Sequence, residues 1–140
     1  MITKKVLVLG ASGQIGRHLI RKLTKNNYVV TAVTRNLHQK GYSLKTQSPI
    51  GFLEIIEENI FNQEKLNNII KNHAICINLI GILFEKKNNT FQNIHVNFPS
   101  ILSKICKEKA QSIHIPGNGK MESLNVAEAA SIVIHYLYKK

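Results

Sequence analysis

Three glycines at intervals of three residues are the part of this 140-residue sequence whose chemistry is easiest to state. Gly10, Gly13 and Gly16 stand between an apolar run and an amphipathic stretch, the order expected of a strand, a turn and a helix. A residue without a Cβ permits a tight turn and lets a phosphate approach the backbone, where the N–H groups at a helix start bind the anion. An ordinary strand-to-helix turn seldom requires three glycines so spaced. We therefore expect a nucleotide pyrophosphate to bind at this loop.

Alternating strands and helices are predicted around the loop. Short apolar runs predict strands at residues 5–10, 29–35, 52–56, 74–83 and 112–115. Apolar residues at helical spacing predict helices at residues 14–26, 63–72, 96–110 and 124–138, with Pro99 tolerable only in a first turn. Residues 36–51 lack periodicity and are expected to form a loop with at most a short helical turn. The expected fold class is α/β, a three-layer fold in which helices cover both faces of a parallel sheet of about five strands.

The glycine spacing resembles that of the extended and atypical short-chain dehydrogenase/reductases, within the NAD-dependent epimerase/dehydratase superfamily. The run 77–85, with Phe91 and residues 95–97, is most similar to the nucleotide-binding accessory subunit of respiratory complex I and its bacterial relatives. The resemblance covers residues 4–112. It implies a Rossmann-like fold that is C-terminally truncated, with a Rossmann domain at residues 1–112. It also implies that this domain holds NADP(H) structurally rather than turning it over, with a respiratory complex or another protein as partner.

The same resemblance assigns the cofactor contacts. Arg35 ends the second predicted strand, where the family carries an acidic residue when it prefers NAD, and a guanidinium suits a 2′-phosphate. NADP(H) is therefore expected rather than NAD, unless Arg35 is simply a solvated strand end. Asn59 stands where the family has an adenine-contacting Asp, and Asn97 matches an Asn of the extended members. The full set expected to bind the cofactor is Gly10, Ser12, Gly13, Gln14, Ile15, Gly16, Arg17, Arg35, Asn59, Ile60, Asn78 and Gly81.

Residues 113–138 resemble a different family. Ile115-Pro116, Gly119 and the run 123–126 are similar to the closing motif of the SpoU-class RNA ribose methyltransferases, which lines an S-adenosylmethionine pocket. The match departs at Gly117 and Ala127, and the upstream motifs, including the one with the catalytic Arg, are absent. S-adenosylmethionine binding is therefore not expected. Residues 113–140 are interpreted as a strand, loop and helix of separate origin, which suggests a fusion or a decayed reading frame.

A possible catalytic set lies near the end of the chain. Tyr136 and Lys140 have the Tyr-x-x-x-Lys spacing of the reductases, in which Lys lowers the Tyr pKa, and Ser123 could orient a carbonyl. However, Lys140 is the last residue given and helix ends fray. We therefore expect no catalytic residues, with Ser123, Tyr136 and Lys140 as the only candidates.

Composition excludes several other functions. The net charge of +11 comes mainly from 16 lysines spread along the chain, so a nucleic-acid site is not expected. Cys76 and Cys106 stand in apolar surroundings, as buried thiols do, and no metal-ligand spacing occurs. The longest apolar stretch, residues 74–84, is too short for the roughly 20 residues of a membrane span. The expected location is the cytoplasm, either free or peripheral to the inner membrane.

Three hypotheses follow. The first is an NAD(P)-binding Rossmann domain with little or no catalysis. The second is an interaction module that has lost the cofactor, and the third is a remnant of an RNA methyltransferase. Because a sheet without its later strands leaves an edge uncovered, a homodimer through that edge is also predicted.

Overall fold

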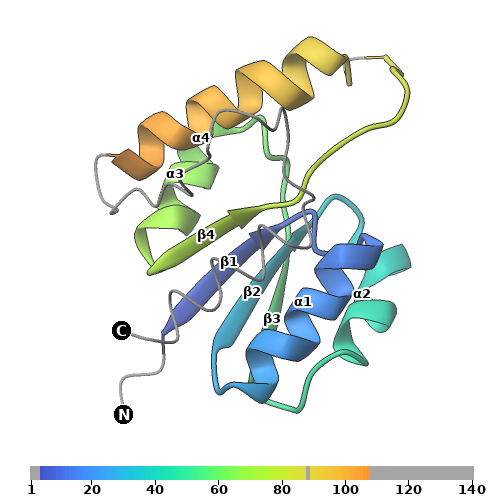
Figure 1. The fold of residues 1–140 in the computed structure, drawn as a ribbon, viewed down its shortest axis with the longest axis vertical. Helices are drawn as coiled ribbons and strands as arrows, with labels where there is room; N and C mark the ends of the chain where they lie inside the picture. The colour runs from blue at the N-terminus through green and yellow to red at the C-terminus, as the bar shows by residue number, and fades with distance from the viewer. Residues whose placement is uncertain (1–3, 88, 108–140) are drawn as a thin grey trace, which may run out of the picture. The chain divides into compact units, whose positions relative to one another are not determined.

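The computed structural model describes residues 4–87 and 89–107. These residues form a parallel sheet with the strand order β3-β2-β1-β4 (Figure 1). The elements in chain order are β1 (Lys5–Leu9), α1 (Gln14–Lys25), β2 (Val29–Thr34), α2 (Leu37–Lys45), β3 (Leu53–Glu57), α3 (Gln63–Lys71), β4 (Ile75–Asn78), the π-helix η1 (Gln92–Asn97) and α4 (Phe98–Lys107). The predicted α/β fold class is confirmed.

The sheet is parallel because every connection between its strands contains a helix. Leu9 of β1 is aligned with Val33 of β2 on one side and with Asn78 of β4 on the other. Thr34 of β2 is aligned with Glu57 of β3. All four strands therefore end at the same edge of the sheet, where open α/β sheets bind ligands.

Helices cover both faces of the sheet: α1 and α2 lie on one side, α3 and α4 on the other (Figure 1). Leu7 and Leu9 alternate with Val6 and Val8 along β1, and all four side chains are fully buried. One core cluster joins the α3 and α4 side to the sheet and contains Leu7, Leu9, Val33, Ile60, Leu66, Ile70, Phe98 and Leu102. Burial on both faces explains the almost unbroken apolar runs of β1 and β2.

The prediction of a loop over residues 36–51 was wrong, because nine of these residues form α2. The side chain of Asn36 caps the helix by accepting a hydrogen bond from the Gln39 N–H. Gly41 and Leu44 are its buried residues, and a Cβ on Gly41 would lie 3.2 Å from the Leu37 side chain. A helix with a glycine in its buried face has little apolar periodicity, which is why the sequence did not reveal it.

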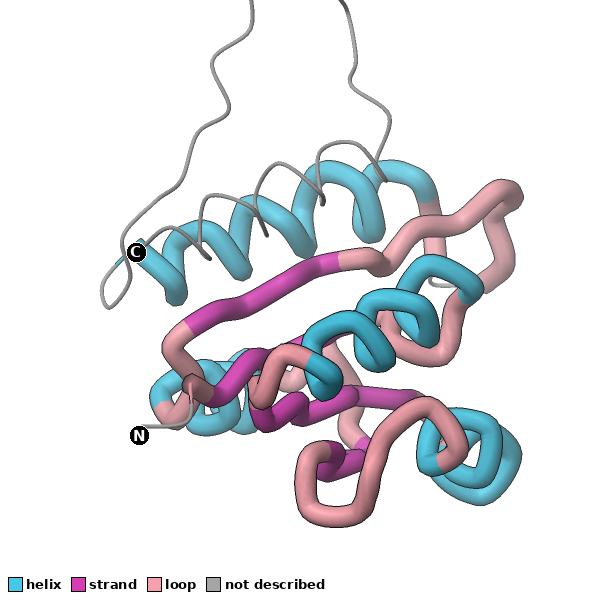
Figure 2. Tube along the Cα trace, turned by 60° about the horizontal axis from the view of Figure 1, so that its bottom comes forward, coloured by secondary structure: helices cyan, strands magenta, loops and turns pink. Residues whose placement is uncertain are grey.

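The fourth strand and the helix that follows also differ from the prediction. The ladder of β4 ends at Asn78 rather than at Leu83, and residues 79–85 continue without strand pairing. Figure 2 shows η1 and α4 as one continuous helical rod, which begins before the predicted residue 96. Pro99 therefore lies inside this rod, directly after the π-helical turns. A proline lacks the N–H that would bind the carbonyl four residues earlier, and a widened turn accommodates this loss.

The remaining predicted elements, at residues 112–115 and 124–138, lie outside the described residues. Among the residues that the structure describes, no helix is both long enough and apolar enough to cross a membrane.

Candidate functional site

A cleft of about 220 Å³ opens at the edge where the strands end. It is lined by Gly10, Ser12, Gly13, Val33, Thr34, Arg35, Glu58, Ile60, Phe61, Leu79, Ile80, Gly81, Ile82, Asn89 and Ile94. We call it the glycine-loop cleft. Most of its lining comes from the end of β2 and from the segments that follow β1, β2, β3 and β4, so the parallel sheet itself brings these segments together.

The surroundings of the three loop glycines differ, and so does the reason why each position is a glycine. Gly10 has a φ of +78°, and a Cβ there would lie 2.7 Å from the carbonyl carbon of Leu79. A Cβ on Gly16 would lie 2.5 Å from the carbonyl oxygen of Ala11, so this glycine lets α1 pack closely on the turn. A Cβ on Gly13 would meet only the carbonyl oxygen of Gly10, at 3.4 Å. Gly10 and Gly16 are thus required by the fold, whereas Gly13 leaves open space beside the cleft.

The start of α1 carries no compensating side chain. Gly13 is its N-cap, no side chain caps it, and its first turn has no acidic residue. In contrast, α2 is capped by Asn36 and α3 by Asn62, with Glu64 in the first turn of α3. The N–H groups and the positive end of the α1 dipole therefore remain available to an anion.

A second hollow, of about 500 Å³, adjoins the cleft. Its lining residues are Arg35, Glu57, Glu58, Asn59, Phe61 and Asn89, of which four are shared with the glycine-loop cleft. We call it the Arg35 hollow. Arg35 is exposed at the end of β2, and the described residues include no ion-pair partner for its guanidinium. A charged group on a ligand could therefore reach it directly.

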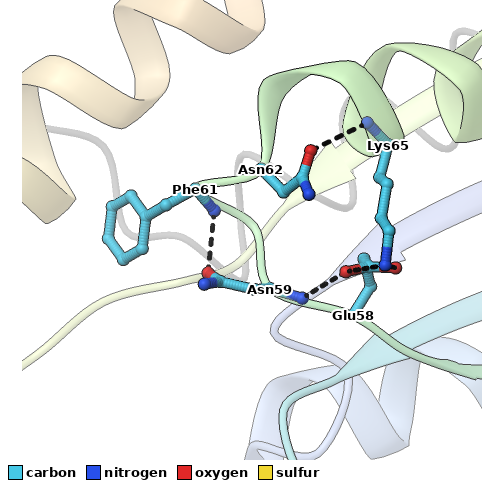
Figure 3. Close-up of polar contacts among 5 residues, drawn as sticks. All are labelled: Glu58, Asn59, Phe61, Asn62 and Lys65. Carbon is cyan, nitrogen blue, oxygen red and sulfur yellow. Dashed lines mark hydrogen bonds and ion pairs between the residues drawn. The ribbon is translucent and has the colours of Figure 1, made fainter.

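A network of hydrogen bonds fixes the loop after β3 (Figure 3). The side chain of Asn59 accepts from the Phe61 N–H at 3.0 Å, and Glu58 accepts from the Asn59 N–H at 3.0 Å. Lys65 forms an ion pair with Glu58 at 3.1 Å. The Asn59 N–H, and then Lys65, lower the pKa of the Glu58 carboxyl below its ordinary value. The loop between β3 and α3 is thereby held in one shape beside both hollows.

The segment after β4 is shaped by Asn78 and His95. The Asn78 side chain accepts from the Ile80 N–H at 3.1 Å, so it turns the chain rather than facing the cleft. A Cβ on Gly81 would lie 3.4 Å from the His95 ring, whose Nε2 is 3.4 Å from the Ile82 nitrogen. The glycine thus lets the η1 helix approach this segment closely.

The structure brings together seven of the twelve residues predicted to bind a cofactor. Six of them line the glycine-loop cleft: Gly10, Ser12, Gly13, Arg35, Ile60 and Gly81. Asn59 lines the Arg35 hollow. Five lie outside both linings: Gln14, Ile15, Gly16, Arg17 and Asn78. Ile15 and Arg17 are exposed on α1, and the Arg17 N–H donates to the Gly13 carbonyl.

Other lining residues were not predicted. Leu79, Ile80 and Ile82 belong to the segment taken for a longer strand, and their place beyond the strand end could have indicated the cleft. Glu57 ends β3 and lines the Arg35 hollow, and Glu58, which follows β3, lines both hollows. Nothing in the sequence indicated that Asn89 lines the cleft, because its position depends on a turn closed by pairing with Lys86. Asn97 bonds to Asn93 and lies outside the cleft.

The remaining predictions concern metal binding, catalysis and the segment that resembles the SpoU class. Among them, no group of three or more potential metal ligands is found. The catalytic candidates Ser123, Tyr136 and Lys140, and the segment 113–138 that resembles the SpoU class, lie outside the described part of the chain.

Comparison with curated proteins gives relatives in respiratory complex I. The chain is 28% identical over 89 residues to the NADH-ubiquinone oxidoreductase 40 kDa subunit of Neurospora crassa, covering 64% of this chain and 24% of that protein. It is 26% identical over 119 residues to the rat NADH dehydrogenase [ubiquinone] 1 alpha subcomplex subunit 9, covering 83% and 32%. The chain thus spans a quarter to a third of the length of these relatives.

Solved structures share the fold. A protein described as an NAD-dependent epimerase/dehydratase from Bacillus halodurans matches with a TM-score of 0.62 and 18% identity, over 76% of this chain and 47% of that one. ElxO with NADPH bound matches with a TM-score of 0.57 and 19% identity, over 76% and 50%. These similarities give no support to the methyltransferase interpretation of residues 113–138. The NmrA-like family model matches residues 2–94, well over half of the chain, and the protein therefore belongs to the NmrA-like family.

Proposed function

We propose that this chain binds a nicotinamide dinucleotide, NAD(P)(H), in the glycine-loop cleft and the Arg35 hollow, and that residues 1–112 are the unit that does so. The observation that carries the proposal is the difference between the three glycines. The fold itself has no room for a side chain at Gly10 or Gly16, whereas a Cβ on Gly13 would meet only one atom, at 3.4 Å. A glycine that the fold does not need is explained if a ligand must approach the backbone there.

The uncapped start of α1 supports the same site. The pyrophosphate would lie over Gly13 and Ser12, where the positive end of the α1 dipole and a first turn without a side-chain cap favour an anion. The adenosine half would extend into the Arg35 hollow, and the nicotinamide half would extend toward Gly81 and Ile82. Asn59 would contact the adenine, with its Oδ1 already fixed by the Phe61 N–H.

Arg35 favours NADP(H) in this proposal. Its guanidinium has no ion-pair partner among the described residues, and it can bind a 2′-phosphate through two parallel hydrogen bonds. Arg17 is exposed on the first turn of α1 but does not line either hollow, so its contribution would require a movement of its side chain.

A non-catalytic role is proposed for the bound dinucleotide. The resemblance to complex I subunits supports a cofactor that is held within a protein assembly. Such a chain would be located at the periphery of a membrane-associated complex. A homodimer through the sheet edge is the alternative assembly, and sedimentation as a stable monomer would contradict it.

The test is a titration of the purified full chain with NADPH, followed by nicotinamide fluorescence and by thermal shift, with NADH and S-adenosylmethionine in parallel. We expect saturable binding of NADPH and none of S-adenosylmethionine. Gly13→Asp should abolish binding, because it adds bulk and negative charge where the pyrophosphate would lie. Asn68→Asp adds the same charge on an exposed part of α3 outside both hollows and should leave the Kd unchanged.

A folded chain that binds neither dinucleotide would contradict the proposal and leave the interaction module. Equal loss of binding in Gly13→Asp and Asn68→Asp would show that net charge, rather than the glycine loop, controls the affinity.

A further inference from the structure

Glu57, which no sequence argument identified, lies at the junction of two elements that shape the Arg35 hollow. It ends β3, and its Oε2 accepts a hydrogen bond of 2.6 Å from the N–H of Leu37, the first residue of α2. Arg35 and Asn36 are the residues between β2 and α2. The Glu57 carboxylate is therefore held directly beside the turn that carries Arg35, and both residues line the same hollow.

Of the three charged side chains that line this hollow, one forms an ion pair with a described residue and two do not. Glu58 is neutralised by its ion pair with Lys65. Glu57 has no ion-pair partner among the described residues, and neither has Arg35. One unpaired carboxylate and one unpaired guanidinium thus face the space in which the adenosine ribose of a dinucleotide would lie.

We propose that Glu57 is a specificity-determining residue of this subsite, which opposes Arg35 and lowers the preference for a 2′-phosphate. The inference rests on the proposed function. A carboxylate offers about four acceptor positions, so a hydrogen bond from Leu37 leaves the other oxygen free to accept from a ribose 2′-hydroxyl. Glu57 thereby supplies, from β3, the acceptor that the end of β2 lacks.

The same carboxylate disfavours a 2′-phosphate in two ways. It repels the phosphate as a like charge, and it occupies the Leu37 N–H, a backbone donor at the start of α2 that the phosphate could otherwise use. NADH and NADPH should consequently bind with Kd values within about tenfold of each other, in spite of Arg35.

The test compares Glu57→Gln with the matched control Glu54→Gln. The Glu57→Gln side chain would keep an oxygen that can accept from Leu37 while losing the charge. Glu54 is exposed on the same strand and lines neither hollow. For the Glu57→Gln variant we expect the Kd for NADPH to fall about tenfold relative to that for NADH, a difference of about 1.4 kcal/mol. The shift should shrink in high salt, because exposed charges are screened. Glu54→Gln should leave the ratio of the two Kd values unchanged.

Glu57→Ser, which removes both the charge and the reach of the side chain, must shift the ratio in the same direction. If both dinucleotides bind and neither Glu57 variant changes their ratio, Glu57 does not determine specificity and the proposed function stands. If the folded wild-type chain binds neither dinucleotide, the proposed function and this inference fail together.

Discussion

Gly10 and Leu79 approach each other so closely that a single methyl group would not fit between them. A Cβ on Gly10 would lie 2.7 Å from the Leu79 carbonyl carbon and 2.9 Å from its oxygen. The Leu79 N–H in turn donates to the Leu9 carbonyl at 2.9 Å. The turn after β1 and the chain after β4 are therefore in contact through backbone atoms, and both residues line the glycine-loop cleft.

Gly10→Ala should destabilise the protein by at least about 3 kcal/mol. A residue with a Cβ is strained at a φ of +78°, and the methyl group would also displace the backbone of residues 79–80. The free energy of unfolding, measured in urea, checks this value.

Gly51→Ala is the matched control for the strain alone. Gly51 has a φ of +89°, but no atom lies within 4 Å of the position of its Cβ. We expect a loss of about 1 kcal/mol. Equal losses in Gly10→Ala and Gly51→Ala would show that the contact with Leu79 carries no cost.

The hydrogen bond between His73 and Thr31 joins the turn before β4 to β2 and should stabilise the fold. His73 Nδ1 lies 2.7 Å from the Ile69 carbonyl oxygen and Nε2 lies 2.7 Å from the Thr31 hydroxyl. Since a carbonyl only accepts, Nδ1 donates, and in the neutral ring Nε2 accepts from Thr31. Thr31→Val should cost about 1–2 kcal/mol, because it leaves a half-buried ring nitrogen without its donor.

A double-mutant cycle isolates this hydrogen bond. The interaction energy of Thr31→Val with His73→Ala should be about 1 kcal/mol in urea unfolding. Additive losses would mean that the two side chains contribute independently, by packing alone.

The first third of the fold could be predicted from sequence because its signals are local. The apolar runs of β1 and β2 and the helical spacing of α1 gave their bounds to within one residue. Gly10 and Gly13 were predicted from the glycine spacing and Arg35 from the family resemblance, and all three line the cleft. These features depend on neighbours within a few positions along the chain.

The errors arose where contacts between distant residues decide the structure. The start of α2 is fixed partly by Glu57, twenty residues further along the chain, and its buried face includes a glycine. β4 ends at Asn78 although the apolar run continues, because the following residues leave the ladder to line the cleft. Apolar composition cannot distinguish these two uses of the same residue types.

The loop after β3 should become less stable in acid. The pKa of Glu58 is lowered in the folded state, so its carboxylate stabilises the fold above the unfolded-state pKa near 4.5, and this contribution is lost as the pH falls below it. Glu58→Gln should therefore lower the Tm at neutral pH but have little effect in acid below the folded-state pKa, as measured by circular dichroism.

Lys65→Gln tests whether the Asn59 N–H or the Lys65 ion pair contributes more to the stabilisation by the Glu58 carboxylate. It removes the ion pair but keeps the Asn59 N–H, the larger cause of the lowered pKa. Its effect on the Tm at neutral pH should be smaller than that of Glu58→Gln. The reverse order would assign the stabilisation to the ion pair.

The thiol of Cys76 should make the fold less stable in alkaline solution. Burial, together with the neighbouring Cys106, raises the pKa of Cys76 from its ordinary value of 9.0 to about 12. Below the ordinary value neither the folded nor the unfolded chain loses this proton, so stability is unaffected. Between about pH 9 and 12 only the unfolded chain loses it, and the free energy of unfolding should fall by up to about 1.4 kcal/mol per pH unit.

Cys76→Ala isolates the contribution of this thiol to the pH dependence of stability. The variant loses some packing at every pH, but its free energy of unfolding should fall less steeply above about pH 9 than that of the wild type. Because only a thiolate reacts readily, the folded wild type should also be alkylated slowly by iodoacetamide at Cys76 in mildly alkaline buffer. Parallel slopes together with rapid alkylation would mean that Cys76 ionises as easily in the fold as in the unfolded chain, and that the core beneath β4 admits water.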